Sequence, residues 1–523
     1  MTGLPQPSAK AAGLVSDLTA LLGPGTASAE PADLWATSRD CWPRSLLWTK
    51  AAQVPHPPDA VAWPRDAAQV QAVVKWAAAS GVAIVPYGAG SGVCGGTIPV
   101  RGGVALDLKR LAGMPHIDLR ERTVEAEAGL NGQRLEELLN GAGATLGHFP
   151  SSIYCSTVGG WLAARSAGQL SSRYGKIEDM VLSIEAVDGT GALIQAEPGA
   201  GPDLVQLLVG SEGTLGVITR ATLRCWPVPG GRWLRGVRFK SVERGMEAMR
   251  LLMRSGLRPA VMRLYDPLDT LLAGKSGGAA VHVPIPGPVK ALFEAGQREA
   301  LRLALRAPLL LNRLVDALPA ASLLILGFEG ESEPDARADG EDALDISKQA
   351  GGEDLGAAPG EKWLANRYKI SYRQSPLFSA GAFVDTMEVA TTWDRLPRLY
   401  VAVRRAVESH AFVLAHFSHA YLEGCSIYFT FVGPGGMAAA EASRATPEAL
   451  DDLRAAEGRY DACWRAALSA VCDQGATLSH HHGVGLAKQV FLPREHGEGM
   501  RQLRALKKAF DPHGIMNPGK LLL

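Results

Sequence analysis

Three consecutive histidines near the carboxyl end of the chain are the residues best suited to carry chemistry. His480, His481 and His482 stand between an apolar helical stretch and the glycine-containing turn Gly483-Val484-Gly485. Clustered imidazoles can lower the pKa of a neighbouring acid, and they can coordinate a metal ion. A histidine tract on a solvated turn is the competing interpretation, but such a tract is expected among Ser, Asn and Lys residues. The surroundings therefore favour a functional site.

A glycine-rich loop far earlier in the chain is the second candidate. The segment Pro86-Tyr87-Gly88-Ala89-Gly90-Ser91-Gly92 directly follows an apolar run. Because glycine lacks a Cβ and tolerates positive φ, consecutive backbone N–H groups can converge on a pyrophosphate there. The segment lacks the glycine spacing and following helix of a Rossmann site, and it lacks the Gly-Lys-Ser/Thr of a P-loop. A plain tight turn has the same local pattern, so this loop indicates a binding site only in combination with other segments.

Two further segments are rich in small and hydroxylic residues. One runs over Gly147–Gly160 and continues to Gly168, and the other runs over Gly210–Thr219. Small side chains let backbone and hydroxyl donors approach a flat, polar heterocycle closely. Each segment alone could be a structural turn, whereas the three in this order and spacing indicate one binding site.

Helices and strands alternate around these segments. An amphipathic helix is predicted over Ala67–Ser80, ended by Gly81, and a buried strand over Val82–Val85. Further predicted elements are the strands Ala105–Leu108, Val124–Ala128 and Gly216–Cys225 and the helices Leu14–Leu22, Leu130–Leu139 and Met500–Phe510. This alternation predicts an α/β or α+β domain.

A cluster of Pro and Gly at residues 227–231 predicts a domain boundary, after which residues 231–470 form a second region. Within it, residues 290–318 are rich in Leu and Arg, and Pro308 is expected to divide or kink the helical pattern. Such a stretch fits a membrane surface or an apolar tunnel, and it fits equally well a helix packed on its own sheet. Residues 331–360 are expected to form a solvated helix and a loop.

Composition excludes several classes of function. The chain of 523 residues is 47% hydrophobic and 20% charged, with 53 basic and 53 acidic side chains. A chain of this length suggests more than one substructure, and its zero net charge gives no global field for nucleic acid. The seven cysteines are scattered without a C-x-x-C pair, which argues for reduced thiols and against a zinc module. No secretory signal and no apolar run of ~18–20 residues is visible, so we expect a cytoplasmic protein.

The three small-residue segments resemble the FAD-binding fold of the vanillyl-alcohol oxidase and p-cresol methylhydroxylase superfamily. The resemblance covers roughly residues 35–523 and includes Asn517-Pro518-Gly519-Lys520 near the end. Within the superfamily, the sequence most resembles the alkyldihydroxyacetonephosphate synthases. The segments Ser156–Trp161, Gly210–Thr219 and Ser479–Gly485 carry this resemblance.

The resemblance implies an α+β, two-domain protein. It implies an N-terminal extension over 1–34, a PCMH-type FAD-binding domain over 35–230, a cap domain over 231–470 and a C-terminal segment over 471–523 that completes the flavin site. The position that carries a covalently bound flavin in some relatives corresponds to Gly90 or Ser91, so non-covalent FAD is expected. The implied FAD contacts are Pro86, Tyr87, Gly88, Ala89, Gly90, Ser91, Gly92, Ser151, Ser152, Ile153, Tyr154, Cys155, Ser156, Thr157, Ala164, Arg165, Ser166, Ala167, Glu212, Gly213, Thr214, Leu215, Gly216, Val217 and Ile218.

The resemblance also implies catalytic residues. Tyr421, in a segment ending Gly424-Cys425-Ser426-Ile427-Tyr428-Phe429, matches the acid/base tyrosine of the family. A tyrosine acts as a base near neutral pH only if a cationic neighbour lowers its pKa, and His480, His481 and His482 are the candidates. Arg263 matches an arginine that supports the histidines. Alternatively, Tyr421 is a strand residue facing solvent, and Arg263 forms a structural ion pair with Asp266 or a neighbouring residue.

The last implied residue is the arginine that would bind the substrate phosphate. The family's phosphate-binding arginine falls on Gln374, with Arg373 one residue away. In a helix, one residue rotates a side chain by ~100°. Arg373 is nevertheless the substrate-binding candidate.

Two functions from different classes follow from the resemblance. The first is exchange of the acyl group of acyl-dihydroxyacetone phosphate for a fatty alcohol, with no net redox change, as in ether-lipid synthesis. The second is FAD-linked oxidation of a D-2-hydroxy acid. A metal site is typical of the second group, and His419, His481 and His482 are of the right type, but we predict no metal. We expect a lipid-like small-molecule substrate and no nucleic acid, and peripheral membrane contact and a homodimer are left open.

Overall fold

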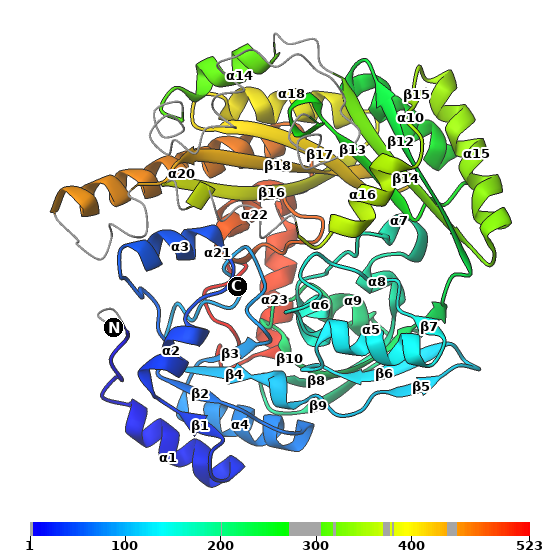
Figure 1. Cartoon of the computed structure of the whole chain (residues 1–523). Coiled ribbons are helices and arrows are strands. Elements are labelled where there is room, and N and C mark those ends of the chain that lie inside the picture. The colour runs from blue at the N-terminus through cyan, green and yellow to red at the C-terminus, as the bar shows by residue number, and fades with distance from the viewer. Residues whose placement is uncertain are drawn as a thin grey trace. The chain divides into compact units, whose positions relative to one another are not determined.

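The computed structural model describes residues 4–199, 201–270, 305–316, 321–369, 377–378, 381–436 and 447–523. The chain forms two compact units, each with its own sheets (Figure 1). The first unit comprises Met1–Gly168, Gly175–Val228 and His481–Leu523, and the second comprises Gln169–Tyr174 and Pro229–His480. Helices and mostly antiparallel sheets occur in both units, so the predicted α+β class is confirmed.

The first unit contains a small sheet with three parallel strands and one antiparallel edge strand. Its strands in spatial order are β1 (Ala27–Ser28), β2 (Ala60–Ala62), β4 (Val104–Asp107) and β3 (Ile84–Tyr87). Helix α4 (Ala67–Ser80) has the predicted bounds, and its predicted apolar stripe is buried. Asp66 caps its first turn through the Gln69 N–H, and Gly81, at φ 64°, ends it.

A five-stranded antiparallel sheet forms the rest of the first unit's framework. Its strands in spatial order are β5 (His116–Asp118), β6 (Thr123–Glu127), β10 (Gly216–Arg224), β8 (Val181–Asp188) and β9 (Leu193–Ala196). A separate two-stranded ladder joins β7 (Ala144–Thr145) to β11 (Trp226–Pro227). The helical elements of this unit are α1 (Ala11–Leu22), α2 (Pro31–Thr37), α3 (Pro43–Lys50), α4, η1 (Leu108–Arg110), α5 (Gly132–Gly141), α6 (Val158–Ala163), α8 (Ile177–Met180), α9 (Leu204–Leu208), α21 (Gly485–Lys488), η3 (Gln489–Phe491), α22 (Leu492–His496) and α23 (Gly499–Phe510).

The second unit is built on one antiparallel sheet of seven strands (Figure 1). In spatial order they are β15 (Glu353–Asp354), β12 (Gly231–Phe239), β14 (Ser322–Gly330), β13 (Val261–Tyr265), β17 (Phe412–Ala420), β18 (Gly424–Pro434) and β16 (Ala382–Thr392). Its described helices are α7 (Ser171–Tyr174), α10 (Val242–Arg254), α14 (Pro308–Asp316), α15 (Glu333–Gln349), α16 (Ala358–Asn366), α18 (Leu396–Val407) and α20 (Pro447–Asp473). Among the described helices, none is both long and apolar enough to cross a bilayer.

Some sequence expectations for the second unit fall outside the described residues. Arg373 and most of the basic apolar stretch 290–318 are among them. In the described part of that stretch, Pro308 is the first residue of α14, where its missing N–H costs no hydrogen bond. In 331–360, the expected solvated helix is α15, which also buries Ala336, Ala343 and Leu344.

Cross-strand register explains where the polar residues of the second unit gather. Tyr265, His416, Tyr428 and Glu388 are successive opposite partners on β13, β17, β18 and β16. Because side chains alternate between the faces of a sheet, these four share one face. Their strand neighbours Leu264, Phe417, Ile427 and Val389 are apolar, fully buried and share the other face.

Asp40, in the connection between α2 and α3, makes folding of the first unit sensitive to pH. Burial raises the pKa of its carboxyl to about 7, although one oxygen accepts the Trp42 N–H at 3.0 Å. Since the folded state holds this proton more tightly than the unfolded state, Asp40 makes stability fall as pH rises from about 4 to 7.

We therefore predict that Asp40→Asn is more stable than the wild type above pH 7, by up to about 4 kcal/mol. The amide oxygen of asparagine can keep the Trp42 bond without burying a charge. Melting temperatures of both proteins at pH 4.5 and pH 8 would test this, with the exposed Asp66→Asn cap variant as a control for charge loss alone. An advantage of Asp40→Asn that does not grow with pH would contradict the prediction.

Candidate functional site

The three small-residue segments converge within the first unit. The glycine loop leaves the end of β3, and a Cβ on Gly88 would lie 2.6 Å from Thr157 Oγ1. Thr157 is the N-cap of α6 and accepts the Gly160 N–H. A Cβ on Gly213 would lie 2.9 Å from the Pro86 ring, and the Glu212 N–H bonds the Ala163 carbonyl at 3.0 Å. Side chains therefore pack so closely against the backbone of Gly88 and Gly213 that neither position has room for a Cβ.

The glycine loop has the backbone character of an anion cradle. Gly90 adopts φ 64°, and a Cβ there would overlap the Tyr87 hydroxyl. Among the described residues, none accepts a hydrogen bond from the N–H groups of Gly88 to Gly92. Gly88 to Ser91 are buried or half-buried, whereas Gly92 is exposed. Shielded amides without acceptors are rare in folded chains and suit an anionic ligand such as a pyrophosphate. The residues present thus fit the predicted dinucleotide.

Glu212 joins the glycine loop region to the turn after the histidines. Its backbone is at φ 50°, and its carboxylate accepts the N–H groups of Val484 and Gly485, the latter at 2.9 Å. Asn517 donates to the carbonyls of Gly96, at 2.9 Å, and Glu212, at 2.6 Å. The carboxyl-terminal tail is therefore an integral part of the first unit.

His481 and His482 belong to the first unit, and so does a further histidine, His148. The rings of His481 and His482 meet edge to face, with centroids 4.6 Å apart. His148 is buried beside Trp161, at 4.7 Å between centroids, and its Nε2 lies 3.2 Å from Ser166 Oγ. Burial, and then the charge of His481, lower the pKa of His148 to about 3. His148 is therefore neutral at physiological pH.

In the second unit, Tyr421 follows β17 and its hydroxyl is held by a side chain far away in sequence. Ser171 Oγ, on α7, lies 3.0 Å from Tyr421 Oη and 2.7 Å from His419 Nδ1. The other ring nitrogen of His419, Nε2, lies 2.7 Å from Tyr428 Oη. Tyr421 is half-buried within this hydrogen-bonded set, so the alternative of a strand tyrosine facing solvent does not describe it.

A β-bulge places His419 in this set. The register of β17 with β18 shifts between Ser418 and Ala420, and His419, the extra residue, adopts φ 54°. A left-handed backbone is uncommon for a residue with a Cβ, and such outliers gather at functional sites. Hydroxyls lie within hydrogen-bond distance of both ring nitrogens of His419, that of Ser171 at Nδ1 and that of Tyr428 at Nε2.

His480 is the histidine that the second unit places beside Tyr421. Its ring centroid lies 5.4 Å from that of Tyr421 and 5.7 Å from that of His419. The fully buried Glu388 on β16 accepts the His480 N–H, and the Thr477 N–H bonds the Ala390 carbonyl at 3.0 Å. The segment before the histidine run thus extends the edge of the sheet, which holds His480 in position.

Arg263 supports a histidine that the sequence prediction did not single out for this role. Its Nη2 lies 2.6 Å from His416 Nε2, while His416 Nδ1 lies 3.2 Å from Asp269. Burial, and then Arg263, lower the pKa of His416 well below its usual value, so the ring is neutral and accepts from the guanidinium. Asp266 is held by Arg404 at 3.2 Å, and the charge of Arg263 acts instead on the neighbouring Asp269. Burial raises the pKa of the Asp269 carboxyl, and the smaller, opposite effect of Arg263 lowers it.

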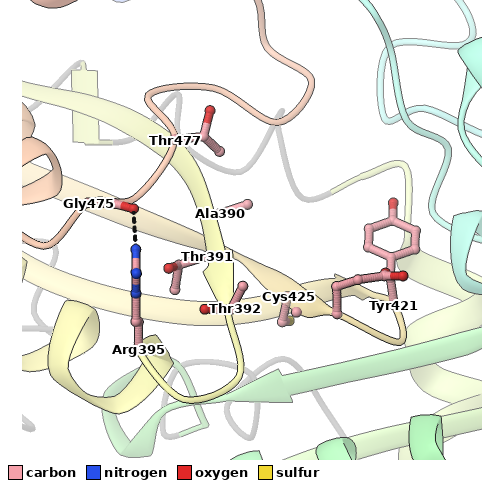
Figure 2. A pocket seen from close by; sticks show the side chains of 10 residues that line it. Ala390, Thr391, Thr392, Arg395, Tyr421, Cys425, Gly475 and Thr477 are labelled. Atoms are coloured by element: carbon pink, nitrogen blue, oxygen red, sulfur yellow. Dashed lines mark hydrogen bonds between the residues drawn. The ribbon is translucent and has the colours of Figure 1, made fainter. Parts of the chain in front are cut away.

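A pocket of ≈ 280 Å³ lies at the ends of β16 and β18. Figure 2 shows Tyr421 at one side of it, and Arg395 at the other side, donating to the Gly475 carbonyl at 3.1 Å. The Tyr421 hydroxyl points away from the strand residues Thr391, Thr392 and Cys425 that line the floor. The pocket therefore gives access to one side of the Tyr421 side chain.

In the second unit, the sequence prediction missed the residues that join Tyr421 to the sheet: Ser171, His416, Tyr428, Glu388 and, as a partner of Tyr421, His419. In the first unit, it missed His148. Ser171 lies only four residues after Ala167, but nothing in a single sequence links α7 to Tyr421. For His416 and Tyr428, the spacing of two between polar residues in an otherwise apolar strand was an available signal.

Comparison with known proteins extends these observations. A model of the C-terminal domain of FAD linked oxidases matches residues 232–521, and a model of an FAD binding domain matches residues 58–197. The chain is 31% identical over 493 residues to an alkyldihydroxyacetonephosphate synthase of Dictyostelium discoideum, covering 92% of this chain and 76% of that protein. It is 26% identical over 472 residues to the mitochondrial D-lactate dehydrogenase (cytochrome) of Arabidopsis thaliana, covering 89% and 73%. A solved alkyldihydroxyacetonephosphate synthase superposes with a TM-score of 0.75 at 26% identity, covering 98% of this chain and 86% of that one.

Proposed function

Because this chain belongs to the FAD-linked oxidase family, in its alkyldihydroxyacetonephosphate synthase-like branch, we propose that it exchanges the acyl group of acyl-dihydroxyacetone phosphate for a fatty alcohol. FAD is its cofactor, and its two-domain FAD-binding fold is that of the superfamily. We further propose that FAD is bound non-covalently, because Gly90 or Ser91 stands where some relatives attach the flavin, and that residues 35–230 and 471–523 bind it.

The observation that carries this proposal is the setting of Tyr421. Its phenol lies between Ser171, at 3.0 Å, and the ring of His480, in a chain whose synthase relatives span most of its length. A hydroxyl donor and a neighbouring imidazole both favour the phenolate form, which is the basic form of tyrosine. The site therefore supports proton abstraction by Tyr421.

The chain's own residues would act as follows. FAD, when bound, supplies a ring that accepts electron density from a carbon next to a carbonyl group. Tyr421 takes a proton from C1 of the substrate, which is acidified by the adjacent ketone, and Ser171 and His480 stabilise the phenolate before this step. The acyl group leaves as a carboxylate, and the alcohol oxygen takes its place on C1 while the hydroxyl proton of the alcohol passes to the departing carboxylate or to solvent. The proton returns from Tyr421 to C1, so no net oxidation occurs.

Oxidation of a D-2-hydroxy acid is the second candidate, and the similarity to D-lactate dehydrogenase favours it. In that reaction a base removes the hydroxyl proton, and the electrons leave the protein through an acceptor. Each unit contains a neutral histidine, His148 in the first and His416 in the second, and a neutral imidazole is compatible with such a base. The absence of net redox chemistry is what separates the first candidate from the second.

One experiment distinguishes the two candidates. Purified holoprotein is given palmitoyl-dihydroxyacetone phosphate with an isotope-labelled fatty alcohol, and separately D-lactate or D-2-hydroxyglutarate with a dye acceptor. We expect labelled ether lipid and released fatty acid in equal amounts, with no dye reduction. Dye reduction by a hydroxy acid without ether product would replace the first candidate by the second.

A further inference from the structure

Ser171, His419 and Tyr428 form a continuous hydrogen-bonded line that ends at the Tyr421 hydroxyl. The three contacts measure 3.0 Å from Tyr421 Oη to Ser171 Oγ, 2.7 Å from Ser171 Oγ to His419 Nδ1 and 2.7 Å from His419 Nε2 to Tyr428 Oη. These contacts join α7 to the consecutive strands β17 and β18; Ser171 is 248 positions from His419 and 250 from Tyr421. Each hydroxyl can act as donor or as acceptor, so the hydrogen bonds along this line can run in either direction.

Every member of the line is shielded from water or half-buried. Ser171 is 2% exposed and His419 is 4% exposed. Burial and the charge of Glu388 raise the pKa of Tyr428 well above its usual value, so its hydroxyl stays protonated and can accept from the imidazole or donate to it. Low exposure strengthens each hydrogen bond and excludes water as a competing proton carrier.

We propose that Ser171 and His419 are positioning residues that carry the Tyr421 proton. The proposal rests on the assignment of Tyr421 as the acid/base group. In the resting arrangement, Tyr421 donates to Ser171 Oγ, Ser171 donates to His419 Nδ1, and His419 Nε2–H donates to Tyr428 Oη. The Ser171 proton moves to His419 Nδ1, and the Tyr421 proton moves to Ser171 Oγ.

The result is a phenolate that accepts a hydrogen bond from Ser171, together with an imidazolium that donates through both nitrogens. One O–H bond of Tyr421 breaks, one N–H bond of His419 forms, and the net charge of the group is unchanged. Only the Ser171 hydroxyl lies between the negative charge on Tyr421 and the positive charge on His419. Their attraction lowers the free energy of this charge-separated state. The ring of His480, tilted by 31–32° against those of Tyr421 and His419, adds to the polar surroundings of the phenolate.

The bulge at His419 gives this arrangement an independent structural basis. Without the extra residue, regular alternation would continue the pairing beyond Ser418, and position 419 would lie on the face opposite to Tyr428. The positive φ of His419, 54°, is the conformational cost of presenting its two nitrogens to Ser171 and Tyr428.

Other titratable groups face this line and must be held constant in any test. They are Tyr174 on α7 with its partner Glu329 on β14, Arg263 on β13, Asp269, His416 on β17, Glu388 on β16 and His480. None of them is altered by the substitutions below.

The test is a titration of Tyr421 itself in the flavin-loaded protein. Ultraviolet difference spectra between each protein and its Tyr421→Phe counterpart isolate the phenolate absorbance of this one residue. The proteins are the wild type, Ser171→Ala, His419→Asn and the neighbouring control Ser172→Ala. Asparagine tolerates the positive φ and keeps a polar atom near Ser171, but it cannot accept a proton, so a merely structural role would survive.

We expect Tyr421 to ionise about one to two pH units higher in Ser171→Ala and His419→Asn than in the wild type, and unchanged in Ser172→Ala. An unchanged midpoint in His419→Asn overturns the proposal, and this variant decides alone if Ser171→Ala does not fold. The titration needs neither substrate nor dye. A wrong substrate assignment would appear as missing ether product from the wild type, with the titration difference intact.

Discussion

Replacing Tyr421 by Phe is expected to lower turnover by about 10²–10⁴-fold while FAD stays bound, because the substitution removes the acid/base hydroxyl and little else. The phenyl ring still fills the space beside His480, and the partner Ser171 keeps its contact with His419. The measurement is ether product formed per flavin, with flavin content taken from its visible absorbance.

Tyr400→Phe is the matched control for this prediction. It also removes one phenol hydroxyl from the second unit, 3.3 Å from Asp266, but Asp266 keeps Arg404 and the Ala415 N–H as partners. Its turnover is expected within about twofold of the wild type. A Tyr421→Phe protein as active as Tyr400→Phe would remove Tyr421 from the mechanism.

Replacing Gly90 by Ala is expected to weaken FAD binding by about 10–100-fold. A Cβ at this position would overlap the Tyr87 hydroxyl, which itself bonds the carbonyls of Ala36 and Arg39, so the loop rather than Tyr87 must move. Overpacking of this kind typically costs about 1–3 kcal/mol. The displaced loop would carry its N–H groups away from the cofactor. Fluorescence titration of the apoprotein with FAD measures the effect.

Gly25→Ala is the control that distinguishes the effect of the steric clash at position 90 from the effect of backbone strain. Gly25 has φ 69°, close to the 64° of Gly90, but a Cβ there would meet nothing within 4 Å. Both variants therefore suffer from alanine at positive φ, and only Gly90→Ala suffers from the overlap. Equal FAD affinities for the two variants would show that the glycine loop does not hold the cofactor.

The sequence alone determined those features that depend on local chemistry. The periodicity of Ala67–Ser80, the Asp66 cap and the Gly81 stop are short-range effects, so the helix was predicted to the residue. The same is true of the small residues at Gly88, Gly90 and Gly213, where a neighbouring side chain lies within 3.0 Å of the place that a Cβ would take. The family resemblance, and with it FAD, also rested on such segments and is confirmed.

Only the tertiary structure decided which side chains meet. Within the second unit, His480 lies beside Tyr421, because Glu388 and the Thr477–Ala390 bridge bind the preceding segment to β16. Ser171 reaches Tyr421 through packing of α7 against β17, and His419 joins them through a one-residue bulge. A bulge changes the facing of a side chain without changing the apolar pattern of the strand. Long-range register of this kind leaves no trace in the spacing of residues along one chain.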